Sequence, residues 1–322
     1  MAHPIPVVPY DPEVAGPLAQ MVSLMPDEVT VEMLPMLRTA SRYPATHPGL
    51  QDGTILAAEY SAVAADGHQI VLTSYRRADH QPGSPGVYWI HGGGLIAGDR
   101  FTGIDLALAW LDRWDLVVAT VEYRLAPEFP YPTPFEDCYR GLEWFAGQAD
   151  MLGFDPARLA VGGASAGGNL AAAVTLAARD RRGPAIAAQL LMSPMLDDRN
   201  VTVSSHQYTA KSSWSRSSNL LGWGCYLGEA RGSADVPCYA APARLTDFSG
   251  LPTTYLDGGT AEVFRDEIAA YAQGLWAAGT QAELHLWAGA IHGFSALAPA
   301  ARVSRQATEA VGGWLRRALD LA

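Results

Sequence analysis

The sequence predicts an α/β fold in which helices flank a mostly parallel sheet. Strand-like and helix-like segments alternate along the chain from about residue 55. Several strand-like segments are continuous apolar runs, as in strands that are buried on both faces of a parallel sheet. Segments 135–152 and 265–279 separate such runs and are long enough for helices. In a doubly wound fold of this kind, the catalytic groups lie at the carboxyl ends of the strands.

The expected strands follow one another in a simple order. Segments 57–63 and 68–77 carry the β-branched and aromatic residues of two paired strands. The later strands are expected within six largely apolar segments, which are 86–94, 115–128, 158–163, 188–194, 251–259 and 282–293. Helices between these segments allow neighbouring strands to run parallel.

Two regions fall outside this alternation, residues 1–45 and 197–250. We expect them to form a helical cap over an α/β domain made of residues 46–196 and 251–322. The first region is rich in methionine, whose flexible side chain suits a surface that covers a pocket. Ordinary core packing explains the same residues, and the sequence leaves both interpretations open.

Composition limits the partners of the chain. Of its 322 residues, 49% are hydrophobic, which is enough for a substantial core. The formal net charge is −11 and the lysines and arginines are not clustered, which argues against a surface for nucleic acid or for an anionic membrane. No apolar window reaches the length of a membrane span.

The cysteines and the first residues bear on the cellular compartment. Three cysteines form an odd set without metal-ligand spacing, which fits a reducing compartment better than a disulfide framework. Prolines interrupt residues 1–17, where a signal peptide needs an unbroken apolar core. We therefore expect a cytoplasmic protein with packed, reduced thiols and no metal site.

A serine lies among glycines in the stretch VGGASAGGNL, residues 161–170. Gly163, Ser165 and Gly167 form G-x-S-x-G, the pattern of a nucleophile elbow that holds a serine at the tip of a strand-to-helix turn. An apolar run precedes the pattern and an alanine-rich helical segment, 169–182, follows it. Glycines also serve plain tight turns, so the elbow depends on finding its partners elsewhere in the chain.

Backbone donors for an oxyanion are expected from WIHGGG, residues 89–94, at the end of a predicted strand. The N–H groups of Gly93 and Gly94 are unhindered, and the N–H of Ala166 follows the candidate nucleophile. A phosphate-binding loop is the alternative, but it would need G-x-G-x-x-G or a following lysine with serine or threonine, which this segment lacks.

His292 is the best candidate for the general base among eight histidines. It follows the last predicted strand and precedes the last helix. A fold with a nucleophile elbow supplies its catalytic histidine from this loop. A histidine in a surface loop without a role is the alternative. The acid should follow the preceding strand, because the order is serine, acid, histidine. Glu262 lies in the loop there, whereas the competing carboxylates are Asp257 at the strand end and Asp266 and Glu267 in the next helix.

With these residues in place, the chain resembles the hormone-sensitive-lipase-like branch of the α/β-hydrolases, the bacterial family IV carboxylesterases. The resemblance extends from about residue 80 to the C-terminus. Its motifs are HGGG at 91–94, EYRLAPE at 122–128, GASAGGNL at 163–170, FRDE at 264–267 and HGF at 292–294. It implies an eight-stranded, mostly parallel sheet with a helical cap, in which the EYRLAPE segment supports the oxyanion loop.

Two residues depart from the pattern of this family. Ala164 replaces an aspartate that usually precedes the serine, so a hydrogen bond behind the elbow is expected to be missing. Glu262 and Val263 stand where aspartate and proline are commoner, and glutamate has one more methylene with which to reach the histidine.

The resemblance implies a serine carboxylesterase for short- to medium-chain esters, with Ser165, Glu262 and His292 as triad and Gly93, Gly94 and Ala166 as oxyanion hole. It implies no metal and no organic cofactor, a small-molecule ester as partner, and a homodimer paired through the last strand. A binding protein on the same scaffold, an amidase and an acyltransferase are the alternatives. Trp214, Trp223 and Met195 are candidates for the pocket wall, and packing of these side chains against one another is the alternative.

Overall fold

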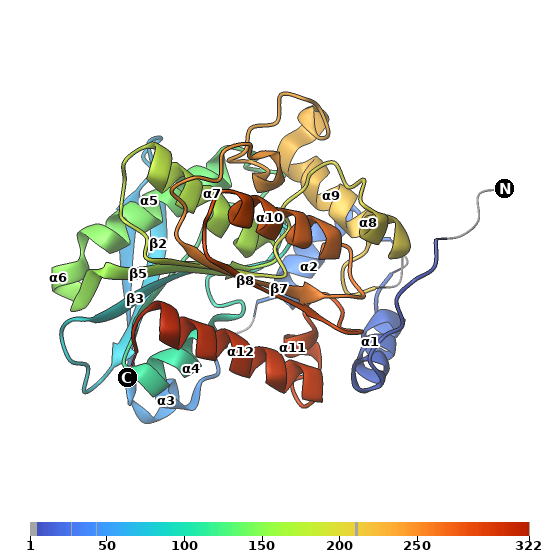
Figure 1. Cartoon of the computed structure of the whole chain (residues 1–322). Helices are drawn as coiled ribbons and strands as arrows, with labels where there is room; N and C mark the ends of the chain where they lie inside the picture. The colour runs from blue at the N-terminus through green and yellow to red at the C-terminus, as the bar shows by residue number, and fades with distance from the viewer. Residues whose placement is uncertain (1–4, 27, 43, 210–211, 322) are drawn as a thin grey trace.

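The computed structural model describes residues 5–26, 28–42, 44–209 and 212–321. Its centre is an eight-stranded sheet in the order β1-β2-β4-β3-β5-β6-β7-β8 (Figure 1). The strands are β1 (Ile55–Val63), β2 (Gln69–Arg77), β3 (Ser84–Ile90), β4 (Val117–Val121), β5 (Phe154–Ala164), β6 (Ala188–Met192), β7 (Thr253–Gly259) and β8 (Ala282–Trp287). Only the pairs that include β2 are antiparallel, which confirms the mostly parallel sheet predicted from the sequence.

The segment 115–128 forms a shorter strand than the sequence suggests. Only Val117–Val121 pairs in the sheet, and all five of these residues are buried. The following residues leave the sheet at its carboxyl edge, where they contact the loop after β3. Strand β5 is longer than its apolar run, because it begins at Phe154.

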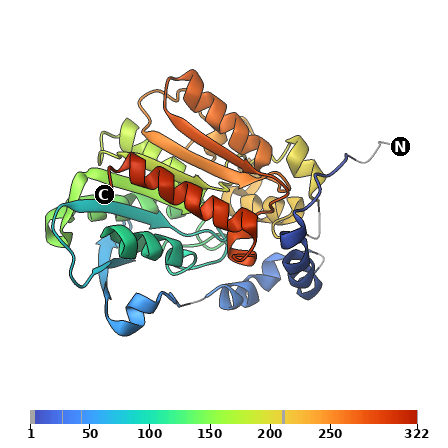
Figure 2. The same ribbon diagram turned by 60° about the horizontal axis from the view of Figure 1, so that its bottom comes forward.

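Helices cover both faces of the sheet, as Figures 1 and 2 show. One face packs against α4 (Ile104–Trp114) and α12 (Arg302–Ala318). The other packs against α5 (Thr133–Gly147), α7 (Ala166–Asp180) and α10 (Arg265–Ala277). Two apolar clusters therefore form, one on each face.

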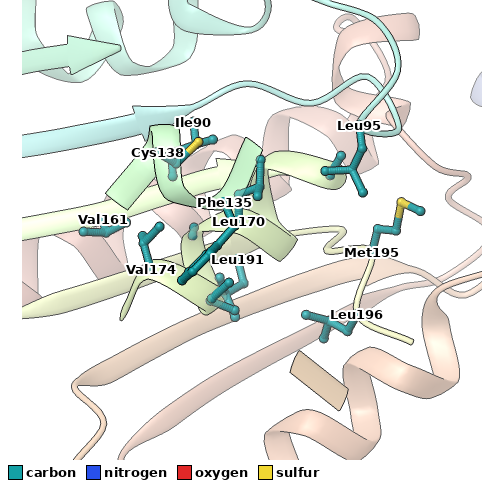
Figure 3. Packing of buried hydrophobic residues seen from close by; sticks show 14 of the residues in the cluster. Ile90, Leu95, Phe135, Cys138, Val161, Leu170, Val174, Leu191, Met195 and Leu196 are labelled. Carbon is teal, nitrogen blue, oxygen red and sulfur yellow. The ribbon is translucent and has the colours of Figure 1, made fainter. Parts of the chain in front are cut away.

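Side chains of a single strand alternate between the two clusters. In β3, Val87 and Trp89 pack on the α4 side, whereas Tyr88 and Ile90 pack on the α7 side. Figure 3 shows part of the cluster on the α7 side of the sheet. In it, Ile90 and other strand residues lie close to side chains of α5 and α7. Period-two alternation in strands that are buried on both faces explains the continuous apolar runs.

The remaining helices are short or lie beyond the carboxyl ends of the strands (Figure 1). They are α1 (Pro12–Leu24), η1 (Val31–Met33), α2 (Leu34–Ala40), α3 (Pro48–Asp52), α6 (Ala149–Leu152), α8 (Val203–Gln207), α9 (Arg216–Leu227), η2 (Gly228–Ala230), η3 (Pro242–Arg244) and α11 (Phe294–Leu297). The two regions outside the alternation touch each other, since the Val8 N–H donates to the Tyr208 hydroxyl at 3.2 Å. In the described ranges, no helix has both the length and the apolar character needed to cross a membrane.

Candidate active site

Ser165 lies between the end of β5 and the start of α7 in a strained conformation. Its φ is 58° and its ψ is −120°, a region that non-glycine residues rarely adopt. Hydrogen bonds hold this conformation, since the Ser165 N–H donates to the Met192 carbonyl at 2.8 Å. The Ser165 carbonyl accepts from the N–H groups of Asn169 and Met195, both at 3.1 Å. The strained turn leaves the side chain partly exposed at the carboxyl edge of the sheet.

The glycines around Ser165 are required by close approach of the backbone. A Cβ on Gly163 would overlap the Gly167 carbonyl, and a Cβ on Gly167 would overlap the Ile90 carbonyl at the end of β3. On Gly168 it would lie 2.8 Å from Cβ of Pro194. The pattern G-x-S-x-G-G therefore reflects the tight packing of the turn between β3 and the loop after β6.

Three segments that are distant in the sequence bring one serine, one histidine and one glutamate together. Nε2 of His292 lies 2.9 Å from Oγ of Ser165, and Nδ1 of His292 lies 2.7 Å from Oε2 of Glu262. The second oxygen of Glu262 accepts a hydrogen bond from the Gly259 N–H at 2.6 Å. Because the Glu262 carboxylate accepts a hydrogen bond from the Nδ1–H group, the proton stays on Nδ1 and Nε2 is free to accept the serine proton.

Neighbouring side chains fix the imidazole of His292. The ring of Phe264 meets it edge to face, with centroids 5.0 Å apart, and the indole of Trp214 lies on another side at 6.4 Å. Oγ of Ser213 donates to the His292 carbonyl at 2.7 Å. Since Glu262 is fully buried, the hydrogen bond between acid and base is shielded from water.

The loop after β3 presents glycine N–H groups near the nucleophile. A Cβ on Gly92 would lie 2.8 Å from the Ala164 carbonyl, so this loop and the elbow are in contact. Gly93 and Gly94 have φ values of 117° and 64°, which favour glycine. Among the described residues, no hydrogen bond uses the N–H of Gly93, Gly94 or Ala166 as a donor. Ala166 is the first residue of α7, where helical N–H groups have no acceptor within the helix.

His91 and Tyr123 hold the loop after β3 in place through hydrogen bonds and ring stacking. Nδ1 of His91 lies 2.7 Å from the Gly92 carbonyl, so it donates there and fixes the orientation of the next peptide unit. The ring of His91 stacks on Tyr123 at 4.1 Å, and the Tyr123 hydroxyl donates to the His91 carbonyl at 2.9 Å. Burial lowers the pKa of His91, which keeps the imidazole neutral in this role.

Arg38 of α2 connects the N-terminal region to the same loop. Its guanidinium donates to the carbonyls of Ile96 and Ala126, each at 2.8 Å, and forms an ion pair with Glu128 at 2.6 Å. The Ala126 N–H in turn donates to the Leu95 carbonyl at 3.0 Å. These contacts agree with the supporting role expected for the EYRLAPE segment. Arg38 could not be predicted as a site residue from the sequence, because no motif surrounds it.

The other candidate acids have different partners. Asp257 is buried and accepts the Ser193 N–H at 3.2 Å, and burial together with the nearby Glu262 raises its pKa to about 7. Asp266 accepts the Ser204 N–H at 2.7 Å. Glu267 accepts the Leu196 N–H at 2.6 Å, and burial raises its pKa. Within the described part of the chain, Glu262 is the only carboxylate that hydrogen-bonds to His292.

The three side chains predicted to line the pocket differ in their exposure to solvent. Trp214 is partly exposed, whereas Trp223 and Met195 are fully buried. An apolar cleft of about 750 Å³ lies between α9 and residues 127–131, and no triad residue lines it. In the part of the chain that the structure covers, no group of three or more histidine, cysteine or acidic side chains is arranged to hold a metal ion.

Comparisons with known proteins agree with this fold. Residues 87–296 match the family described as alpha/beta hydrolase fold. Carboxylesterase NlhH of Mycobacterium tuberculosis is 34% identical over 237 residues, which cover 73% of this chain and 74% of that protein. Esterase LipI of the same species is 33% identical over 236 residues, 71% of each chain.

Solved structures give a similar result over nearly the whole chain. A bacterial heroin esterase superposes with a TM-score of 0.86 at 36% identity, covering 96% of this chain and 98% of that one. Esterase LipW from Mycobacterium marinum superposes with a TM-score of 0.82 at 30% identity, covering 97% and 98%. The chain therefore belongs to the α/β hydrolase fold family, in the hormone-sensitive-lipase-like branch that its motifs predict.

Proposed function

We propose that this chain is a serine carboxylesterase that hydrolyses small esters through an acyl-enzyme intermediate. The observation that carries the proposal is the hydrogen-bonded line from Ser165 through His292 to Glu262. It lies beside N–H groups that have no partner among the described residues. Relatives named as carboxylesterases and esterases support the same activity.

The reaction begins when Oγ of Ser165 attacks the ester carbonyl carbon and Nε2 of His292 takes the serine proton. The carbonyl oxygen becomes an oxyanion, which the N–H groups of Gly93, Gly94 and Ala166 stabilise. Glu262 stabilises the imidazolium and holds its orientation. As the tetrahedral intermediate collapses, the bond from carbon to the alcohol oxygen breaks and His292 gives its proton to the alcohol.

Water completes the cycle by the same steps. His292 takes a proton from the water as it attacks the acyl carbon, and the acid leaves while the proton returns to Ser165. Because the imidazole must be neutral to act as base, we expect the rate to fall when acid protonates it.

An amidase or an acyltransferase would use the same triad, and a panel of esters, amides and alcohol acceptors separates these activities. A binding protein that had lost a triad member is not favoured, since all three are present.

We also propose a cap made of residues 1–45 and 197–250, which would limit substrates to short and medium acyl chains. The position of α1, α2, α8 and α9 beyond the strand ends supports this proposal for the described residues (Figure 1). A dimer paired through β8 is supported by the place of this strand at the edge of the sheet. The three free cysteines support a cytoplasmic location.

The test combines labelling with hydrolysis. A fluorophosphonate should label the wild type once, at Ser165, and the p-nitrophenyl esters of two- to eight-carbon acids should be hydrolysed. Ser165→Ala should abolish labelling and lower kcat by about 10⁶-fold. Ser249→Ala, which changes an exposed serine remote from the site, serves as control. An intact wild type that neither labels nor hydrolyses any of these esters would refute the proposal.

A further inference from the structure

The indole of Trp214 contacts both ends of the candidate reaction site. Its Cη2 atom occupies the space that a Cβ on Gly94 would need, so the ring lies directly against the oxyanion loop. Its centroid is also 6.4 Å from the centroid of the His292 imidazole. One side chain therefore spans the distance between the expected oxyanion donors and the base.

Polar contacts hold this indole in place. Its Nε1 donates to Oδ1 of Asn219 at 3.4 Å, and Nδ2 of Asn219 donates to Oδ1 of Asn200 at 3.1 Å. Both asparagines are fully buried. A buried amide pair keeps its orientation because an unpaired amide would lose hydrogen bonds. These contacts restrain the orientation of the indole.

The residues on either side of Trp214 are anchored as well. Ser213 donates to the His292 carbonyl at 2.7 Å, and Oγ of Ser215 accepts the Ser218 N–H at 3.2 Å at the start of α9. Phe264, the other aromatic neighbour of the imidazole, is fully buried, whereas Trp214 is partly exposed. Trp214 is therefore the aromatic neighbour of His292 that is accessible to a ligand.

The chemistry of ester cleavage defines which part of a substrate meets this indole. The alcohol oxygen must accept a proton from Nε2 of His292, so the first carbons of the alcohol lie beside the imidazole. The carbonyl oxygen must lie at the N–H groups of the glycine loop. We therefore expect a side chain that lies beside both the imidazole and Gly94 to border the alcohol part of the substrate rather than its acyl chain.

We propose that Trp214 determines specificity by limiting the size of the alcohol part of the ester. This inference rests on the proposed esterase function. Branched alcohols place methyl groups next to the reacting carbon–oxygen bond, where the indole leaves the least room. Replacing the Trp214 side chain by the methyl group of alanine should therefore raise kcat/KM selectively for esters of branched alcohols.

Two substrate series test the proposal on wild type, Trp214→Ala and Trp214→Phe. The first holds the acid as acetate and varies the alcohol through ethyl, isopropyl and tert-butyl. The second holds the alcohol as ethyl and varies the acid through acetate, isobutyrate and pivalate. The readout is kcat/KM from acid release in a pH-stat. A methylene in a pocket changes kcat/KM by roughly 10- to 200-fold, so the tert-butyl to ethyl ratio should rise about tenfold or more in Trp214→Ala.

The expected pattern has two further parts. Trp214→Phe should raise the tert-butyl to ethyl ratio less than Trp214→Ala does, and the pivalate to acetate ratio should change less than about threefold in both variants. Trp276→Ala, which removes an exposed tryptophan of α10, should leave both ratios unchanged. Fluorophosphonate labelling of each variant reports that its nucleophile is intact.

Different failures have different meanings. An active wild type whose alcohol ratio is unchanged in labelled Trp214→Ala overturns this inference alone. A change confined to the acid series also overturns it, because the indole would then border the acyl chain. If Trp214→Ala does not label, Trp214→Phe decides the matter by the same ratios. A wild type that hydrolyses none of these esters overturns the esterase function together with the inference.

Discussion

Nδ1 of His292 lies 2.7 Å from Oε2 of Glu262, although 30 residues separate them in the sequence. The other oxygen of Glu262 accepts the Gly259 N–H at the end of β7. The carboxylate is fully buried, and each of its two oxygens faces a single N–H donor. This arrangement fixes which nitrogen of the imidazole carries the proton.

Replacing Glu262 by glutamine should lower kcat by roughly 10⁴-fold, the effect expected when a triad acid becomes an amide. If the amide oxygen faces His292, the NH₂ group faces the Gly259 N–H, and two donors meet. If the amide turns over, Nδ1 must become the acceptor, and Nε2 then carries a proton and cannot act as base. Hydrolysis of p-nitrophenyl acetate by the purified variant measures the loss. Glu262→Asp keeps the charge, so its kcat should fall less than that of Glu262→Gln. A glutamine variant with more than a tenth of the wild-type kcat would contradict the role of Glu262 as triad acid.

Gly167→Ala should destabilise the fold, because the new Cβ would overlap the Ile90 carbonyl and lie 2.6 Å from that of His91. These are backbone atoms, so β3 and the elbow must move apart. Overpacking of this kind costs about 1–3 kcal/mol of unfolding free energy, and sometimes more. Urea unfolding followed by circular dichroism gives the difference.

Gly224→Ala provides the matched control in α9, since nothing lies within 4 Å of its Cβ position. An alanine in a helix is more favourable than glycine by about 1 kcal/mol, so this variant should be as stable as wild type or more so. Equal midpoints for the two alanine variants would contradict the packing explanation.

The sheet was predictable because burial on both faces makes parallel strands continuously apolar, as in β4 and in residues 159–163 of β5. Ser165 was predictable for a related reason, since Gly163 and Gly167 contact backbone atoms that tolerate no side chain. Such features are local and leave a pattern in a few neighbouring residues. The order of the strands, with β4 between β2 and β3, leaves no such local pattern.

Contacts between distant segments were not predictable. Arg38 reaches carbonyls 58 and 88 residues away, and nothing in its own segment indicates them. Ser213 and His292 are 79 residues apart, and their contact depends on how the region after β6 folds back. Trp214 was one of three candidates for the pocket wall, and only its position against Gly94 and His292 distinguishes it from the buried Trp223.

Arg38→Ala should lower kcat by about tenfold with little change in KM, because it loosens the oxyanion loop without touching the substrate. The variant leaves the carbonyls of Ile96 and Ala126 without their donor. Loss of the ion pair with the exposed Glu128 should matter little. Arg38→Lys should recover only part of the rate, since one ammonium group lacks the planar fork that reaches several acceptors.

Steady-state kinetics with p-nitrophenyl acetate separate kcat from KM for both Arg38 variants. Arg113→Ala on α4, which lies on the opposite face of the sheet, is the control and should keep both constants. A rise in KM with unchanged kcat would show that Arg38 acts on substrate binding instead.

Asp257→Asn should stabilise the protein increasingly as the pH rises. Burial, together with repulsion from Glu262, raises the pKa of Asp257 to about 7, whereas an unfolded aspartate has a pKa of about 3.9. Between these values the folded state binds more protons, so the contribution of Asp257 to stability is present below pH 4 and is lost as the pH rises through about 7. This difference of about three pKa units changes the free energy of unfolding by at most about 4 kcal/mol. The asparagine does not titrate and still accepts the Ser193 N–H through its amide oxygen.

Urea unfolding of wild type and Asp257→Asn from pH 4.5 to 8.5 measures this difference directly. Glu267, whose pKa burial also raises, titrates in both proteins, so its contribution cancels in the comparison. Asp150→Asn, which replaces an exposed carboxylate of α6, is the control for removing a surface charge. If the difference for Asp257→Asn does not change across this range, the Asp257 carboxyl group binds no more protons in the folded state than in the unfolded state, and a raised pKa is contradicted.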